Sequence, residues 1–134
     1  MSLKYLLDTN ICIYIAKTRP LNVLRRFESL ATGVVGMSVI TYGELSFGAQ
    51  KSQYQETALT KLNELVDYIP VLTPDESVGM YYGNIRFYLE RAGTPIGNND
   101  LWIGAHALSL GLTLVTNNER EFKRIPDLKI ENWV

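Results

Sequence analysis

The stretch LLDTNICIY, residues 6–14, determines how this chain is expected to fold. Residues 3–7 are mostly apolar, as a strand buried on both faces would be, and a helix is expected over about residues 10–17. Asp8 lies at their junction, where burial of an unpaired carboxylate would be costly. Asp8 therefore either caps the following helix or belongs to a functional site.

The composition is that of a globular protein, expected to form a single domain over residues 1–134. Its hydrophobic fraction of 46% supplies enough apolar material for a core. A net charge of −1 excludes a polycation that binds nucleic acid by charge alone. Cys12 is the one cysteine, so no intramolecular disulfide can form, which suits the cytoplasm. We expect neither a signal peptide nor a membrane span.

Short apolar segments alternate with helical patterns along the rest of the chain. Further strands are expected at residues 34–38, 67–72, 112–116 and 128–132. Further helices are expected from Pro20 to Gly33 and at residues 39–50, 54–66, 73–93, 99–110 and 119–124. This alternation predicts an α/β fold with a parallel sheet that is covered on both faces.

Two prolines refine this prediction near the middle of the chain. Pro70 places the strand at 67–72 near a sheet edge, because proline cannot donate to a strand ladder. The tetrapeptide TPDE is expected to open the next helix, with Thr73 as its N-cap, Pro74 at the first helical position and Glu76 closing a capping box.

Three carboxylates stand where the local pattern calls for apolar residues. Asp8 ends the first strand, and in parallel sheets the working crevice lies beyond the carboxyl ends of the strands. The segment 39–50 could form a helix or a strand, and the spacing of Ile40, Glu44 and Phe47 favours a helix with Glu44 on a semi-buried face. Asp100 stands in the first turn of an otherwise apolar helix.

Each acid also has a structural explanation when it is taken alone. Asp8 could cap a helix, Glu44 could pair with an arginine, and Asp100 could favour the helix dipole. Together, however, three acids in one crevice repel one another. A hard divalent cation such as Mg²⁺ or Mn²⁺ would offset that repulsion, and such a site is typical of phosphoryl transfer.

The same residues resemble a known family over nearly the whole chain. LLDTNICIY and SVITYGELSFGA are similar to the first two motifs of the VapC toxins, which are PIN-domain ribonucleases of type II toxin–antitoxin systems. GTPIGNNDLWIGAHALSLGLTLVTNNEREFKRI is similar to the third and fourth motifs, and LKIENW resembles the usual ending. Four motifs in family order make the resemblance specific.

The resemblance implies a PIN-like three-layer α/β/α sandwich with a short central parallel sheet. It places the family's metal-binding acids on Asp8, Glu44 and Asp100, and implies a Mg²⁺- or Mn²⁺-dependent endoribonuclease. In this assignment Asp8 and Asp100 ligate the metal, and Glu44 orients or deprotonates the attacking water. The expected polar surroundings are Thr9, Asn10, Thr116 and Asn118.

The resemblance also implies substrates and partners. Many family members cut tRNA or structured rRNA, and likeness to enteric-type members suggests the anticodon loop of initiator tRNA by analogy. The expected assembly is a homodimer, inhibited by a VapB-type antitoxin whose tail inserts into the active site. Operator DNA would be bound only through that antitoxin, and no membrane partner is expected.

One position departs from the family pattern. Many PIN domains carry a fourth acid where this chain has Asn118. Asn118 could hydrogen-bond a metal-bound water or a ligand carboxylate, and Glu121 is an alternative source of the missing charge. Equally, the two residues could form only an N-cap and its capping-box partner. The number of metal ions therefore stays open.

Several residues near these motifs are more simply explained by packing or solvation. His106 is expected to be a structural histidine rather than a crevice residue, and Trp102 to pack rather than stack on RNA. Some of the basic residues are expected to border the crevice; the candidates are Lys17, Arg19, Arg25, Arg26, Arg86, Lys123 and Arg124.

Two other functions compete with the ribonuclease. A structure-specific DNA nuclease also clusters acids, but it usually carries more of them together with extra DNA-binding elements. A catalytically inactive PIN domain that serves as a binding subunit or co-repressor predicts a lost acid, whereas all three are present.

Overall fold

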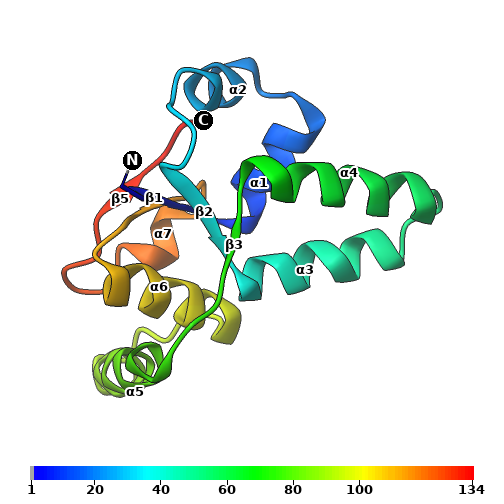
Figure 1. Ribbon diagram of the computed structural model, residues 1–134. Coiled ribbons are helices and arrows are strands. Elements are labelled where there is room, and N and C mark those ends of the chain that lie inside the picture. Colours follow the sequence, from blue (N-terminus) through cyan, green and yellow to red (C-terminus); the bar gives the residue numbers. More distant parts are fainter. Residues whose placement is uncertain (1) are drawn as a thin grey trace.

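The computed structural model describes residues 2–134 and contains a sheet of five parallel strands (Figure 1). Their order across the sheet is β3-β2-β1-β4-β5. The strands are β1 (Tyr5–Leu7), β2 (Val35–Ser38), β3 (Val71–Leu72), β4 (Thr113–Val115) and β5 (Ile130–Glu131). The parallel sheet predicted from the sequence is confirmed, and β3, which follows Pro70, is an edge strand as expected.

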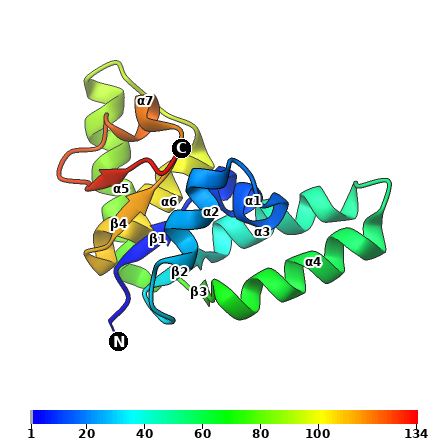
Figure 2. The ribbon, with the colours of Figure 1, turned by 90° about the horizontal axis from the view of Figure 1, so that it is seen from above.

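Helices connect the strands and cover both faces of the sheet (Figures 1 and 2). They are α1 (Thr9–Lys17), α2 (Leu21–Glu28), α3 (Val39–Gln50), α4 (Gln55–Tyr68), α5 (Glu76–Arg91), α6 (Asn98–Leu110) and α7 (Glu119–Phe122). The helix α3 and its neighbour α4 form a hairpin that projects from the sheet in Figure 1. The predicted three-layer α/β/α arrangement is therefore confirmed.

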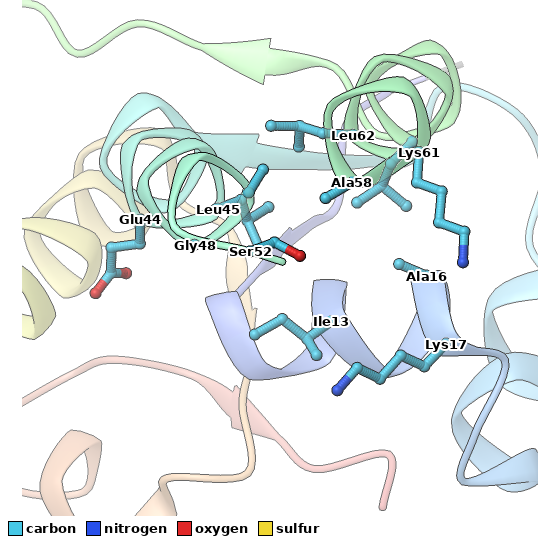
Figure 3. A pocket seen from close by; sticks show the side chains of 12 residues that line it. Ile13, Ala16, Lys17, Glu44, Leu45, Gly48, Ser52, Ala58, Lys61 and Leu62 are labelled. Carbon is cyan, nitrogen blue, oxygen red and sulfur yellow. The ribbon is translucent and has the colours of Figure 1, made fainter. Parts of the chain in front are cut away.

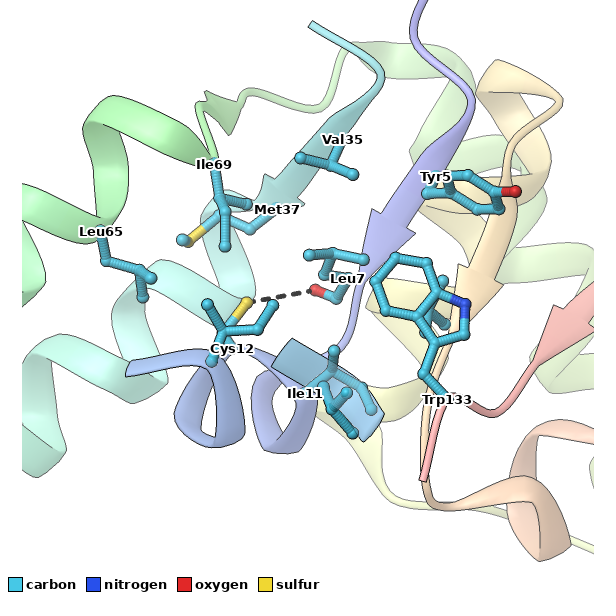
Figure 4. Close-up of a cluster of buried hydrophobic side chains, with 12 residues drawn as sticks. Tyr5, Leu7, Ile11, Cys12, Val35, Met37, Leu65, Ile69 and Trp133 are labelled. Atoms are coloured by element: carbon cyan, nitrogen blue, oxygen red, sulfur yellow. Dashed lines mark hydrogen bonds between the residues drawn. The ribbon is translucent and has the colours of Figure 1, made fainter. Parts of the chain in front are cut away.

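Alternate residues of the central strands supply two separate cores. Tyr5 and Leu7 of β1 face one core together with side chains of α1, α2 and α4, and Figure 4 shows this cluster. Leu6 faces the other core with side chains of α5, α6 and α7. Trp133 closes the first core, because its ring packs edge-on against Tyr5 with centroids 5.4 Å apart.

The strand predicted at 67–72 is wrong in its first half. The helix α4 continues to Tyr68, and the Ile69 amide still donates to the Leu65 carbonyl at 2.9 Å. Leu65 and Ile69 are one helical turn apart and are both buried in the first core. The apolar residues that suggested a strand therefore also satisfy a helical spacing, and only Val71–Leu72 pairs with β2.

Two predicted helix boundaries also differ. Asp75, not Thr73, is the N-cap of α5, because its carboxylate accepts a hydrogen bond from the Ser77 amide at 2.9 Å. Aspartate caps at least as well as threonine and lies directly before the helix. The helix expected from Pro20 to Gly33 begins at Leu21 and ends at Glu28.

Candidate active site

The carboxyl ends of β1 and β4 place Asp8 and Thr116 side by side. The two strands are paired, so the residues that follow them meet at one edge of the sheet. Asp8 is only 4% exposed, and its Oδ2 accepts a hydrogen bond from the Thr116 hydroxyl at 2.7 Å. Its Oδ1 accepts from the Thr9 amide at 2.8 Å, so Asp8 also caps α1. The capping role and the site role are thus compatible.

Glu44 reaches the same region from α3. The Thr9 hydroxyl donates to Glu44 Oε1 at 2.5 Å, and the Asn99 side chain donates to Oε2 at 3.4 Å. Figure 3 shows the Glu44 side chain pointing away from the apolar residues between α3 and α4. The predicted helix and semi-buried position are confirmed, whereas the alternative pairing with an arginine is wrong, because hydrogen bonds from a hydroxyl and an amide hold this carboxylate.

Asp100 lies in the first turn of α6 and is joined to Asn118 and Glu121. The Asn118 side chain donates to Asp100 Oδ2 at 3.3 Å and to Glu121 Oε2 at 2.8 Å. The Asn118 amide donates to Thr116 Oγ1 at 2.9 Å, which links this group to Asp8. Asn118 occupies the N-cap position of α7 but makes no side-chain capping bond, so the capping-box alternative is wrong.

Glu121 has a structural partner that the sequence did not suggest. Gly97, the N-cap of α6, has no side chain to cap that helix, and its backbone amide lies near enough to Glu121 to help lower the pKa of that carboxyl. Glu121 therefore lies beside the first turn of α6, which carries Asp100. Asn99 was also missed, although the run of asparagines before Asp100 was a signal for polar contacts.

The four carboxylates, Asp8, Glu44, Asp100 and Glu121, are called the acidic cluster below. Burial raises the pKa of Asp8, and the charges of Glu44 and Glu121 raise it further against the hydrogen bonds from Thr116 and Thr9. Burial, a hydrogen bond with Glu121 and the charge of Asp8 raise the pKa of Asp100 to about 8. The same interaction and the hydrogen bond from Asn118 lower the pKa of Glu121, so the pKa values of the two neighbouring carboxyl groups move apart.

Within residues 2–134 no lysine or arginine forms an ion pair with the acidic cluster, although the charge of Arg124 helps to lower the pKa of Glu121. The ion pairs found within residues 2–134 join Arg26 to Glu131 and Arg86 to Glu90, outside the cluster. In this part of the chain no three Asp, Glu, His or Cys side chains already form a group that encloses a metal ion. The donor set nevertheless fits one, because its carboxylate oxygens are partly buried, repel one another and are the ligands that Mg²⁺ prefers.

The remaining predicted polar residues border the cluster. The Asn10 side-chain oxygen accepts from the Asn117 amide at 3.3 Å. His106 is buried, with its Nδ1 2.9 Å from the Ser38 hydroxyl, and burial lowers its pKa. Trp102 stacks on Tyr82, with ring centroids 3.9 Å apart. Both the structural histidine and the packing role of the tryptophan agree with the sequence prediction.

The basic residues divide into occupied and exposed ones. Arg86 contacts Glu90 and Tyr82, and Arg124 donates to the Pro95 carbonyl at 2.8 Å. Lys17, Arg19, Arg25 and Lys123 are exposed. The exposed side chains therefore contribute positive charge to the surface. Arg124 instead holds the loop before α6 through its hydrogen bond to Pro95.

An apolar cavity of about 410 Å³ lies beside the acidic cluster, between α1, α3 and α4 (Figure 3). Ile13, Leu45 and Leu62 form part of its wall, and Lys17 and Lys61 also line it. Glu44 is the only member of the acidic cluster among its lining residues. The cavity therefore adjoins the site without containing it.

Across residues 2–134 no helix has both the length and the apolar character needed to cross a membrane.

Comparison with known proteins places these features in a family. The PIN domain pattern matches residues 5–128. The chain is 46% identical over 132 residues to Ribonuclease VapC2 of Haemophilus influenzae, covering 98% of this chain and 99% of the relative. It is 44% identical over 131 residues to the tRNA(fMet)-specific endonuclease VapC of Shigella flexneri, covering 98% of each.

Solved structures agree with the sequence relatives. The toxin in the crystal structure of DNA-bound VapBC from Salmonella typhimurium superposes with a TM-score of 0.92 at 42% identity, covering 98% of this chain and 99% of that one. A chain in VapBC2 from Rickettsia felis, bound to a DNA fragment from its promoter, gives a TM-score of 0.91 at 40% identity with complete coverage of both chains. The chain therefore belongs to the PIN-domain family and, within it, to the VapC ribonucleases.

Proposed function

We propose that this protein is a metal-dependent endoribonuclease that acts on tRNA as the toxin of a toxin–antitoxin pair. The observation that carries the proposal is the partly buried acidic cluster at the carboxyl ends of β1 and β4, in which burial and mutual repulsion raise the pKa of Asp8 and Asp100. Relatives named ribonuclease and tRNA-specific endonuclease support the reaction class. All three acids expected from the sequence take part in this cluster.

In the proposed reaction, Asp8 and Asp100 hold Mg²⁺, or Mn²⁺ in its place. The ion, when bound, lowers the pKa of a coordinated water and stabilises charge on the scissile phosphate. Asp100, whose pKa is raised to about 8 without metal, must lose its proton before it can act as a ligand. Asn118 contacts the carboxylates of Asp100 and Glu121 and keeps them adjacent when that proton leaves.

Glu44 orients the attacking water and accepts its proton. Its two oxygens are fixed by Thr9 and Asn99, from α1 and α6, so it is held between the two elements that carry Asp8 and Asp100. Attack of that water on phosphorus breaks the bond between phosphorus and one ribose oxygen, which takes up a proton from solvent.

Incubation of the purified protein with labelled total tRNA, with and without Mg²⁺, tests the proposal. Cleavage should require Mg²⁺ and should fall more than about a hundredfold in Asp8→Asn, because even residues that only orient metal ligands contribute about 10–100-fold. Asp67→Asn, an exposed acid on α4, is the matched control and should cleave normally. Full activity of Asp8→Asn, or cleavage of duplex DNA in place of RNA, would contradict the proposal.

The target within tRNA is proposed from the relatives. VapC of Shigella flexneri and of Salmonella typhimurium are named tRNA(fMet)-specific endonucleases and are both 44% identical to this chain. We propose the anticodon loop of initiator tRNA as the target here. Initiator tRNA should be cut once and elongator methionine tRNA should remain intact, which gel mapping of the fragments would show.

The apolar cavity between α1, α3 and α4 supports a VapB-type antitoxin as partner. The two toxin–antitoxin complexes reported above share this fold at 40–42% identity. An apolar antitoxin segment in the cavity would reach Glu44 and block the site, and operator DNA would be bound through the antitoxin. Ile13→Glu should weaken co-purification with a co-expressed VapB-type antitoxin and leave tRNA cleavage intact; unchanged co-purification would exclude this groove.

The proposed functional unit is a homodimer in the cytoplasm. Sedimentation of the purified chain measures the first part of this proposal directly.

A further inference from the structure

Residues 116–118 join β4 to α7 and carry two of the side chains that bond the acidic cluster; they are called the β4–α7 linker below. The Thr116 hydroxyl donates to Asp8. The Asn118 side chain donates to two carboxylates of the cluster. Asn117, between these two residues, bonds to other parts of the chain instead. The position of the linker therefore determines where the hydrogen-bond partners of the acids lie.

Asn117 is held by two separate parts of the chain. Its backbone amide donates to the Asn10 side chain at 3.3 Å, and its Nδ2 donates to the Tyr14 hydroxyl at 3.1 Å. Both partners belong to α1, whose N-cap is Asp8. Its Oδ1 accepts from Nδ2 of Asn132 at 3.1 Å, in the segment that follows β5. The β4–α7 linker is therefore fixed between α1 and the C-terminal segment.

Asn132 is itself well placed to hold the linker. Its Oδ1 accepts from the Val134 amide at 3.0 Å, and its Nδ2 also donates to Glu119 Oε2 at 3.1 Å. Trp133, the next residue, is buried in the first core (Figure 4). A side chain that is oriented in this way has little conformational freedom left to lose when it bonds Asn117. The C-terminal segment can therefore serve as a rigid support.

The chemistry of these bonds suits a site that has to receive a cation. The bonds from Asn132 to Asn117 and from Asn117 to Tyr14 join neutral groups, so they add no charge beside the acidic cluster. A lysine or arginine in their place would pair with the carboxylates and compete with a metal ion for them. Repulsion within the cluster also means that the groups bonded to the acids need support from the rest of the chain.

We propose that Asn132 is a positioning residue of the nuclease site, which acts through Asn117 to hold the β4–α7 linker. The inference rests on the proposed metal-dependent nuclease and adds the C-terminal segment to its site. Asn132 bonds the linker and not the acids, so its effect on the acidic cluster passes through Thr116 and Asn118. It thus fixes the geometry of the metal ligands from outside the cluster.

Kinetics of the Asn132→Ala variant give the first test. The kcat for tRNA cleavage should fall about tenfold, the lower end of what residues that orient metal ligands contribute, while KM should stay unchanged. Arg26→Ala is the matched control, because it removes a different contact of the same segment, the ion pair with Glu131, and leaves the linker bonded. The control should cleave as the wild type does.

A double-mutant cycle tests the route through Asn117. In an Asn117→Ala background the partner of Asn132 is already gone, so adding Asn132→Ala should lower kcat no further. Losses that multiply in the double variant would show that Asn132 acts independently of Asn117, which contradicts the proposed route.

Amide hydrogen exchange of the metal-free protein, measured by NMR, examines the linker without any cleavage. The amides of Asn117 and Asn118 donate to Asn10 and to Thr116 Oγ1. In Asn132→Ala both should exchange severalfold faster, whereas amides within α4 should exchange at the wild-type rate. General destabilisation would instead speed the exchange of both groups.

The results separate this inference from the proposed function. A lower kcat at constant KM, with faster exchange confined to the linker, supports the role of Asn132. A wild-type kcat, a defect in KM alone, an equal loss in Arg26→Ala or unchanged exchange in the linker overturns it and leaves the nuclease standing. A wild-type protein that cleaves no tRNA overturns the proposed function and this inference with it.

Discussion

Two regions of the molecule hold carboxylates with different partners: the C-terminal region around Glu131 and the acidic cluster. Near the C-terminus, Glu131 lies 3.6 Å from the Arg26 guanidinium and accepts from the Trp133 indole at 3.1 Å. At the carboxyl ends of β1 and β4, the acidic cluster accepts hydrogen bonds from hydroxyls and amides and forms no ion pair within residues 2–134. The first arrangement holds the chain end in place. The second is costly until a cation binds, which is what a metal-dependent site requires.

The largest expected effect breaks the cluster itself. Glu44→Gln should lower the rate of tRNA cleavage by about a hundredfold, because the amide cannot accept the proton of the attacking water. The fold should be unchanged, since Thr9 can still donate to the side-chain oxygen. A single-turnover rate equal to that of the wild type would show that Glu44 has no part in the chemistry.

A smaller effect is expected from the residues that hold the acids. Thr9→Val removes the hydroxyl that bonds Glu44 but keeps the backbone amide that bonds Asp8. Cleavage should fall about 10–100-fold, as for other residues that orient active-site groups. Raised Mg²⁺ should not restore the rate of this variant, whereas recovery at high Mg²⁺ would mean that Thr9 acts on metal affinity instead.

Asn118, where many PIN domains carry a fourth acid, allows the cost of one more carboxylate in the acidic cluster to be measured. Asn118→Asp adds a charge next to Asp100 and Glu121, where the asparagine amide now donates to both. Without metal the variant should be less stable by about 1–3 kcal/mol, because hydrogen bonds to charged groups are replaced by repulsion. With Mg²⁺ it should bind the ion more tightly, and urea unfolding with and without Mg²⁺ measures both effects. Equal stability of the two proteins without metal would contradict this account.

The pH dependence of the metal-free protein follows from the same groups. Asp100 keeps its proton in the folded state up to about pH 8 but loses it near 3.8 when unfolded, so stability should fall as pH rises between these values. The raised pKa of Asp8 acts in the same direction. The lowered pKa of Glu121 acts oppositely, but only near and below its ordinary value of 4.5. Urea unfolding at pH 5 and pH 8 measures the fall, which Asp100→Asn should reduce.

The smallest effect on stability is expected near the C-terminus, where Glu131 is paired with Arg26. Arg26→Ala removes the ion pair with Glu131 and a hydrogen bond to the Tyr5 hydroxyl, but the paired groups are about half exposed. The loss should be about 1 kcal/mol or less, with tRNA cleavage unchanged. A cleavage defect in Arg26→Ala would show that the Arg26–Glu131 pair influences the acidic cluster.

The sequence predicted the positions of the acids because strand and helix patterns alone determine them. Asp8 follows a buried strand, and Glu44 lies on the helical face that Ile40 and Phe47 identify. The closeness of Glu121 to Gly97 and the hydrogen bond from Asn99 to Glu44 could not be predicted, because both depend on the course of the loop at residues 93–97. The assignment of metal ligands stays a prediction.

The central claim is that a divalent cation makes the acidic cluster tolerable, and a Mg²⁺ titration monitored by urea unfolding at pH 7 tests it most directly. Mg²⁺ at about a hundred times its Kd should raise the free energy of unfolding of the wild type by about 2.7 kcal/mol. Asp8→Asn should be more stable than the wild type without metal, since burial penalises the charged form of Asp8, and should gain little from Mg²⁺. A wild-type protein that is indifferent to Mg²⁺ and Mn²⁺, or an Asp8→Asn variant stabilised equally, would contradict the account.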